Sequence, residues 1–235
     1  MKENPNRTKD RRGFTLVELL VVIAIVATLV GVAFSVVPKM RKKGDAAKAV
    51  QNMRQISVLS ATYAADNSMA LPAPEPTVAD SSGNPVRGVM WHQALASIAY
   101  PDTDLSKIRW NHTWWTTNKP VLLNPLMPQK DVRAWFPGYA VNLQININNS
   151  GWGTGWADGP KSRDMRLASI DDPARTPFVV PDRNWFFSKS SLTEVGMNQF
   201  LVDGKFPVLF VDGHVENMVP KEYFSRKLDD MPLKP

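Results

Sequence analysis

Residues 11–37 read RRGFTLVELLVVIAIVATLVGVAFSVV, and this stretch decides the architecture of the first part of the chain. Residues 14–37 form an apolar run that is interrupted by Glu18 and by a few small polar residues. As a helix the run would measure about 36 Å at ~1.5 Å per residue, enough to cross a hydrocarbon core of about 30 Å. We therefore predict a membrane-spanning helix over residues 14–37.

Three other interpretations of the run are less suitable. A cleaved secretory signal has an apolar core of about 7–15 residues and then a small-residue cleavage site, whereas this longer run is followed by Pro-Lys-Met-Arg-Lys-Lys, residues 38–43. A core helix that is apolar on every face is rare in so small a protein. A plain membrane anchor fits the length but leaves Glu18 and the preceding Arg-Arg-Gly unexplained.

The hexapeptide Gly-Phe-Thr-Leu-Val-Glu, residues 13–18, lies between a short basic leader and the apolar run. This arrangement resembles the type IV prepilin signal of pilins and of the pseudopilins of type II secretion systems. The resemblance implies that a prepilin peptidase/N-methyltransferase cuts after Gly13 and methylates the new N-terminus at Phe14. It also implies a single-pass protein of the bacterial inner membrane, with a cytoplasmic leader and a periplasmic or extracellular soluble domain.

Glu18 would be the fifth residue of the processed chain. A carboxylate at the centre of a membrane helix costs about 2.5–3.5 kcal/mol, and less near the interface. We expect the Glu18 carboxylate of one subunit to neutralise the Phe14 amine of a neighbouring subunit, which makes Glu18 the candidate assembly residue. The alternative is a tolerated acid at a helix N-terminus, stabilised by the macrodipole by about 0.3–1 kcal/mol.

The positive charge of the chain lies beside the apolar run. The protein has 28 Lys and Arg against 22 Asp and Glu, a net charge of +6. Residues 1–13 and 39–48 together account for this whole excess, so the basic character belongs to the membrane flanks and no nucleic-acid partner is expected. Because both flanks are basic, the positive-inside rule does not decide the orientation by itself. The absence of cysteine excludes disulfides and thiolate chemistry.

Apolar residues at helical spacing resume at Asp45 and end near residues 66–67, with Asp45 as a candidate N-cap. Pro38 and Gly44 are expected to kink or loosen the chain between the two helical stretches. We therefore divide the chain into a leader (1–13), a membrane and assembly helix (14–37), its amphipathic continuation (38–67) and a soluble domain (68–235).

The soluble domain alternates short apolar runs with turn residues. The pair Asp212-Gly213 stands between two extended runs, which is the composition of a two-residue type I′ hairpin turn. The expected fold class is α+β and pilin-like: a long N-terminal helix packed on a mainly antiparallel sheet.

Three short segments carry a narrower resemblance. They are GYAVN (138–142), DPARTPFVVPD (172–182) and LFVDGHV (209–215), in that order. The chain is similar in these segments to the large pilin-like proteins of Planctomycetes and Verrucomicrobia. Two features of those proteins are missing: the chain has LLNPLMPQ where a Cys-Pro segment often stands, and Val202 where a histidine often precedes Asp-Gly.

Residues suited to catalysis or metal binding are few. The three histidines are far apart in sequence and show no ligand spacing. Some pseudopilins bind calcium near their C-termini, but no calcium-loop spacing is present here. We expect no enzymatic activity, no cofactor and no metal; the expected partners are the processing peptidase, other pilin or pseudopilin subunits bound through the N-terminal helix, and the lipid bilayer.

Tryptophan supplies the alternative hypothesis. Of the eight tryptophans, four lie in two short segments as candidate ligand-binding aromatics: Trp114, Trp115, Trp152 and Trp156. Exposed on one face, they would stack on sugar rings, and the chain would be a membrane-anchored binding protein that recognises a polysaccharide. Buried, they would fill the core of a small domain, because tryptophan covers a large apolar area.

Overall fold

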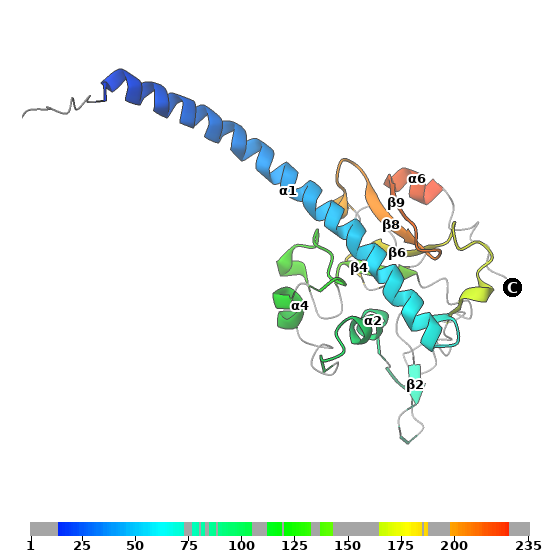
Figure 1. Cartoon of the computed structure of the whole chain (residues 1–235). Coiled ribbons are helices and arrows are strands. Elements are labelled where there is room, and N and C mark those ends of the chain that lie inside the picture. The colour runs from blue at the N-terminus through cyan, green and yellow to red at the C-terminus, as the bar shows by residue number, and fades with distance from the viewer. Residues whose placement is uncertain are drawn as a thin grey trace, which may run out of the picture. The chain divides into compact units, whose positions relative to one another are not determined.

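The computed structural model describes residues 14–72, 77–79, 81–82, 85–87, 89–104, 112–118, 120–132, 137–142, 165–184, 186–187 and 198–225. The chain divides into two compact units, Met1–Lys42 and Lys43–Pro235. The first unit contains the first half of helix α1, and the second contains the rest of α1 and all other elements (Figure 1).

Helix α1 (Leu16–Asp66) is continuous over 51 residues. Pro38 lies inside it and removes one backbone hydrogen bond without ending the helix. The expectation that Asp45 is an N-cap is wrong, because the helix passes through Gly44 and Asp45 and leaves no free amide there to be capped. The membrane-type run and the amphipathic stretch are therefore two parts of one helix.

The main sheet has five strands in the order β7-β4-β6-β8-β9. Their bounds are β4 (Tyr139–Asn142), β6 (Pro177–Pro181), β7 (Phe186–Phe187), β8 (Phe206–Phe210) and β9 (Val215–Met218). The neighbouring strands from β4 to β9 pair antiparallel, and only β7 runs parallel to β4. This confirms the predicted α+β class with a mainly antiparallel sheet.

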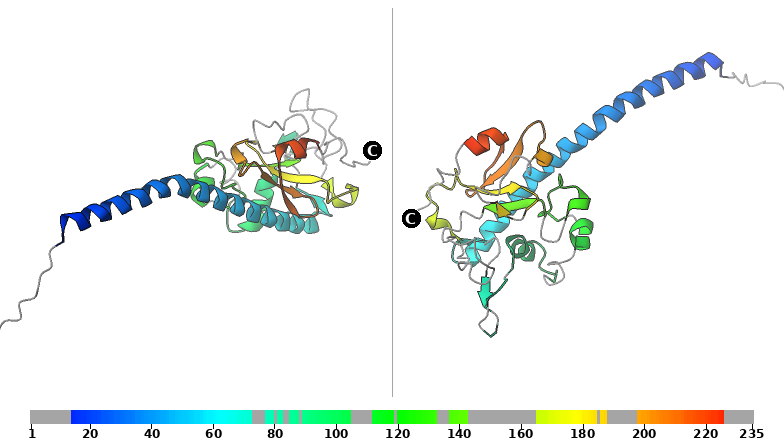
Figure 2. Two further views of the ribbon diagram at one scale, coloured as in Figure 1. Left: turned by 90° about the horizontal axis from the view of Figure 1, so that it is seen from above. Right: turned by 180° about the vertical axis from the view of Figure 1, so that it is seen from behind.

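Smaller elements surround the sheet (Figure 2). Two further strand pairs join β1 (Ala70–Leu71) to β5 (Met165–Arg166) and β2 (Thr77–Ala79) to β3 (Pro85–Arg87). The short helices are α2 (Trp91–Ala99), α4 (His112–Asn118) and α6 (Pro220–Ser225), with single 3-10 turns at Gln129–Asp131, Leu167–Ser169 and Asn198–Phe200.

Side chains of β4 and β8 alternate between two apolar clusters. Tyr139 and Val141 of β4 belong to a cluster that includes Met53 and Ile56 of α1, whereas Ala140 belongs to a second cluster with Tyr223 of α6. This period of two is the pleat of a strand, and burial on both faces explains why the strands read as continuous apolar runs. The sheet is thus covered by α1 on one face and by α6 on the other.

Three contacts fix the second half of α1 on the sheet side. The hydroxyl of Tyr139 donates to the Ala49 carbonyl at 3.4 Å, and Asn52 Nδ2 donates to the Leu123 carbonyl at 3.1 Å. Burial raises the pKa of Tyr139 above its usual range, so this donor keeps its proton. The third is a close approach of the Gly213 backbone to Ser57 of α1: a Cβ added at Gly213 would lie only 2.7 Å from Ser57 Oγ.

The two Asp-Gly pairs of the C-terminal part form different turns. Between β8 and β9, the Gly213 N–H donates to the Phe210 carbonyl at 3.0 Å, and the Phe210 N–H donates to the His214 carbonyl at 2.9 Å. The bond between Phe210 and His214 closes a three-residue loop. A type I′ turn needs a positive φ at both central residues, but only Gly213 has one there, 95°, so the predicted type I′ turn at Asp212-Gly213 is wrong. The type I′ geometry occurs at Asp203-Gly204 instead, with φ 51° and 76°.

The segments that carry the narrower resemblance form the centre of the sheet. GYAVN enters β4 through Gly138, whose φ is 84° and whose missing Cβ would lie 2.7 Å from Asn124 Cβ. Asn124 Nδ2 donates to the Gly138 carbonyl at 3.0 Å, and Asn142 Nδ2 donates to the Pro177 carbonyl at 2.8 Å. Gly138 and Asn142 of these segments therefore have a structural explanation.

A buried carboxyl group follows β6. Asp182 is 8% exposed, and its Oδ1 accepts the Asn184 N–H at 2.9 Å. Burial raises the pKa of this carboxyl group above its ordinary value of 3.8, since the charged form loses its hydration.

We expect Gly213→Ala to lower the free energy of unfolding more than Gly204→Ala. Each places a Cβ on a positive-φ backbone, at a cost of about 1–3 kcal/mol, but nothing lies within 4 Å of a Cβ at Gly204. Ser57→Ala should restore part of the stability lost at Gly213, because it removes the hydroxyl that the new methyl group meets. Chemical denaturation of a chain truncated to residues 43–235 measures these variants; additive effects of Ser57→Ala and Gly213→Ala would contradict the contact.

We expect Asp182→Asn to stabilise the fold increasingly as the pH rises. The folded-state pKa of Asp182 is raised, so the native state holds its proton more tightly and wild-type stability falls as the pH rises from 3.8 through the raised value. Asparagine retains the acceptor for the Asn184 N–H but carries no charge. The measurement is the difference in unfolding free energy between variant and wild type from about pH 4 to about pH 7; a difference independent of pH would contradict the assignment.

Candidate functional site

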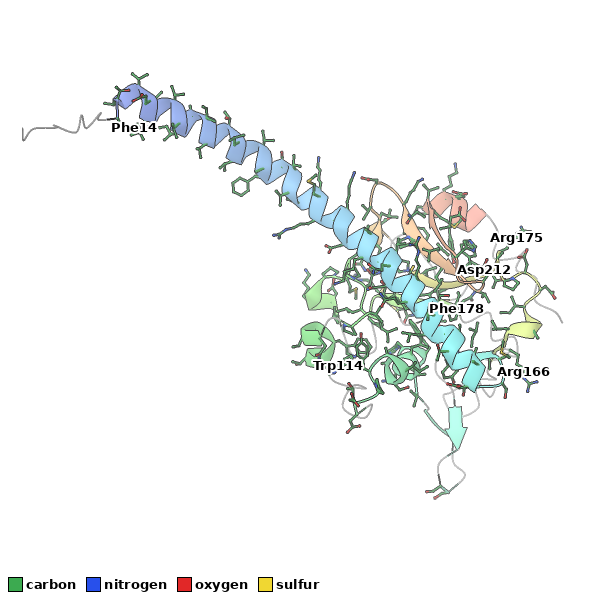
Figure 3. All side chains as sticks on the ribbon, in the orientation of Figure 1. Phe14, Trp114, Arg166, Arg175, Phe178 and Asp212 are labelled. Carbon is green, nitrogen blue, oxygen red and sulfur yellow. The ribbon has the colours of Figure 1, made fainter. Side chains whose placement is uncertain are left out.

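The described part of the chain begins at Phe14, which is 81% exposed, and α1 begins two residues later (Figure 3). Thr15 is the last residue before the helix. The Glu18 carboxylate accepts two hydrogen bonds from Thr15, one from its backbone N–H at 2.8 Å and one from its hydroxyl at 2.9 Å. The Glu18 N–H in turn donates to Thr15 Oγ1 at 3.2 Å. These reciprocal bonds form a capping box at the start of α1.

The capping box uses only half of the Glu18 carboxylate. Both bonds from Thr15 end on Oε2, and within the described residues no hydrogen bond to Oε1 is found. The other carboxylate oxygen can therefore accept a further donor, such as an ammonium group. The helix macrodipole was expected to act on Glu18, but the capping role of Thr15 was not predicted, although the spacing Thr-x-x-Glu is itself the signature of a capping box.

The apolar part of α1 exposes its side chains. From Phe14 to Val37 the large hydrophobic residues are between 42% and 81% exposed. α1 is long and apolar enough to cross a membrane by length and composition. Apolar surface on this scale is stable in a protein only when lipid or another protein covers it. The leader and Gly13 lie outside the described residues.

The aromatic residues of α4 pack against α2. Trp115 is fully buried, with its ring edge-to-face against Trp114 at 5.1 Å and against the buried His92 at 5.6 Å. Trp114 is half-buried and contacts Tyr100 in the same manner at 5.6 Å. A buried ring presents no face to a sugar, so the geometry of Trp115 is that of a core residue. Trp152 and Trp156 lie outside the described residues.

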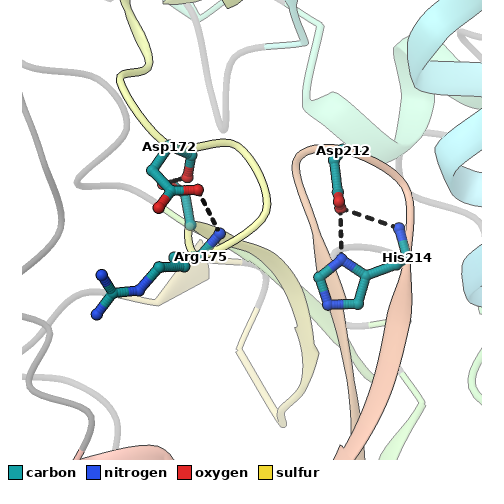
Figure 4. A network of polar contacts seen from close by, with 5 residues as sticks. Asp172, Arg175, Asp212 and His214 are labelled. Carbon is teal, nitrogen blue, oxygen red and sulfur yellow. Dashed lines mark hydrogen bonds and ion pairs between the residues drawn. The ribbon is translucent and has the colours of Figure 1, made fainter.

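Polar side chains lie on two neighbouring turns, one before β6 and one between β8 and β9 (Figure 4). His214 Nδ1 lies 2.6 Å from Asp212 Oδ1, and the imidazole stacks on Phe210 with ring centroids 4.3 Å apart. The Arg175 N–H donates to Asp172 Oδ1 at 3.2 Å, and backbone bonds from residues 211 and 212 tie the two turns together. Among the described residues, no group of three His, Asp or Glu side chains is placed to hold a metal.

Comparison with known families gives one match. Residues 8–34 fit the model of the prokaryotic N-terminal methylation motif, which includes Gly13, Phe14 and Glu18. No match was found among curated proteins or among solved structures. The motif coincides with the start of a long apolar helix that continues into an α+β unit. The chain thus begins with a type IV pilin-like prepilin signal.

Proposed function

We propose that this protein is a pilin-like (pseudopilin) structural subunit that assembles into a type II secretion or type IV pilus-like filament. The observation that carries the proposal is the coincidence of the methylation motif with α1, a single helix whose first half is apolar and exposed and whose second half is packed on a sheet. A subunit of this kind is a structural component and performs no chemistry of its own.

In this proposal, a membrane-bound prepilin peptidase cuts after Gly13 on the cytoplasmic side and methylates Phe14. Removal of the leader leaves the Thr15 amide and hydroxyl intact, because the cut lies on the far side of Phe14. The capping box can therefore persist in the processed chain, and the free Glu18 oxygen can accept the Phe14 ammonium of a neighbouring subunit. The soluble domain lies in the periplasm or outside the cell.

The narrower kinship with the large pilin-like proteins of Planctomycetes and Verrucomicrobia is also part of the proposal. Its support is that the three similar segments are contiguous in space, forming β4, β6 and the β8–β9 hairpin at the centre of the sheet.

The processing step predicts a defined N-terminus. Protein isolated from its native host should begin at N-methylated Phe14, as measured by mass spectrometry. Gly13→Val should block the cut, because a pocket that admits only a hydrogen side chain excludes a β-branched one. A mature pool that retains the intact leader would contradict the prepilin interpretation.

Two substitutions of Glu18 separate its capping role from its charge. Glu18→Gln keeps an acceptor for Thr15 but removes the charge, and Glu18→Val removes both. We expect both variants to insert and to be cleaved, because a membrane charge is removed and the Gly13–Phe14 junction is unchanged. Both should fail to assemble, since the neighbouring ammonium would be left unpaired in an apolar bundle.

The measurement is crosslinking and co-purification of processed subunits, with wild type beside each variant. Assembly of Glu18→Gln at the wild-type level, with failure of Glu18→Val, would show that Glu18 acts as a helix cap and not as a charge partner. Equal assembly of all three proteins would favour a plain anchor.

A further inference from the structure

A group of cations follows the apolar run directly. Lys39, Arg41 and Lys42, which we call the basic segment, lie within the first compact unit on the same continuous helix. All three are exposed. The sequence has no acidic residue between Glu18 and Asp45, so nothing on the neighbouring turns neutralises them.

The position of the basic segment along α1 matches the depth of lipid headgroups. From Leu16 to Val37 the helix rises about 33 Å, close to the ~30 Å thickness of the hydrocarbon core. Lys39 to Lys42 then lie about 3–8 Å beyond the last apolar residue, at the depth of an interfacial layer of roughly 5–8 Å on each side. Because α1 remains helical through Pro38, these cations lie on a helical continuation of the spanning segment.

The neighbouring Lys43 behaves differently. Its Nζ lies 3.0 Å from Asp203 Oδ2, on the type I′ turn of the second unit. Within the described residues no ion pair is found for Lys39, Arg41 or Lys42. At about 100° per residue these three side chains fan out over nearly half of the helix circumference. A broad, unpaired cationic face suits a layer of phosphates around the helix better than a single small anion.

We propose that Lys39, Arg41 and Lys42 bind the headgroup phosphates of anionic phospholipids where α1 leaves the membrane. The proposal rests on the membrane insertion described under Proposed function. With the leader in the cytoplasm, the segment lies on the translocated side, where the positive-inside rule disfavours lysine and arginine. A favourable contact with anionic lipid offsets that disadvantage, and it fixes the depth of α1 until the subunit is withdrawn for assembly.

The test uses the full-length protein in vesicles of equimolar phosphatidylglycerol and phosphatidylcholine. Spin-labelled forms of each lipid report, by electron paramagnetic resonance, which lipid is immobilised beside the helix. The wild type should prefer phosphatidylglycerol by about fivefold or more, since one cation near an anionic surface contributes about a factor of five. The preference should shrink at high salt, because the contact is electrostatic.

The triple variant Lys39→Gln, Arg41→Gln, Lys42→Gln should lose most of this preference and keep only the part that the five cations of the leader contribute at the other flank. Its matched control is Lys48→Gln, Arg54→Gln, Lys221→Gln, which removes the same charge from three other exposed positions and should keep the preference. An unchanged preference in the first variant, or an equal loss in the control, would overturn the proposal. Extraction of the wild type by alkaline carbonate would instead contradict membrane insertion itself, whereas resistance to extraction without lipid preference would contradict only the basic segment.

Discussion

The packing of the second half of α1 against the sheet is the interaction on which the rest of the structure depends. The two halves of this helix suit different environments. The first half exposes apolar side chains on every face, whereas the second half buries a single stripe of side chains. Burial of Met53 and Ile56 contributes about 1.5–3 kcal/mol for each side chain. The polar contacts of Ala49 with Tyr139 of β4 and of Asn52 with the Leu123 carbonyl fix the position of the helix.

The energetics of Glu18 decide what its capping box can explain. A cap contributes about 0.5–2 kcal/mol and the macrodipole about 0.3–1 kcal/mol, while a charge at the centre of a membrane helix costs about 2.5–3.5 kcal/mol. Capping can therefore offset the free-energy cost of the Glu18 charge near the interface, where that cost is small. Deeper in the bilayer the cost is larger, and capping offsets it only in part. A Glu18 drawn into an apolar bundle needs a second partner, and its Oε1 is available for one.

The sequence alone was sufficient for features set by periodicity and composition. The apolar run, the amphipathic stretch ending near residue 66 and the α+β class were all predicted, because each depends on the spacing of apolar residues. Turn chemistry was harder to predict. Both Asp-Gly pairs have the same local composition, and the difference lies in tertiary contact: the Asp212-Gly213 turn abuts Ser57, whereas a Cβ at Gly204 would meet nothing within 4 Å. The predicted helix start at Asp45 was wrong, because a local capping signal does not reveal that the residues before it are already helical.

The charges around α1 suggest an order of events in the proposed assembly pathway. The leader supplies five cations before cleavage, but a similar number follows the apolar run, so the charges alone do not decide the orientation. In the proposed pathway, cleavage removes all five and leaves a Phe14 ammonium that can pair with Glu18 of a neighbouring subunit. The remaining cations then lie on the far side of the apolar run, where anionic headgroups hold them. The processed helix thus binds lipid at one end and a neighbouring subunit at the other. Assembly proceeds when the free energy of the contacts between subunits exceeds that of the contacts with lipid.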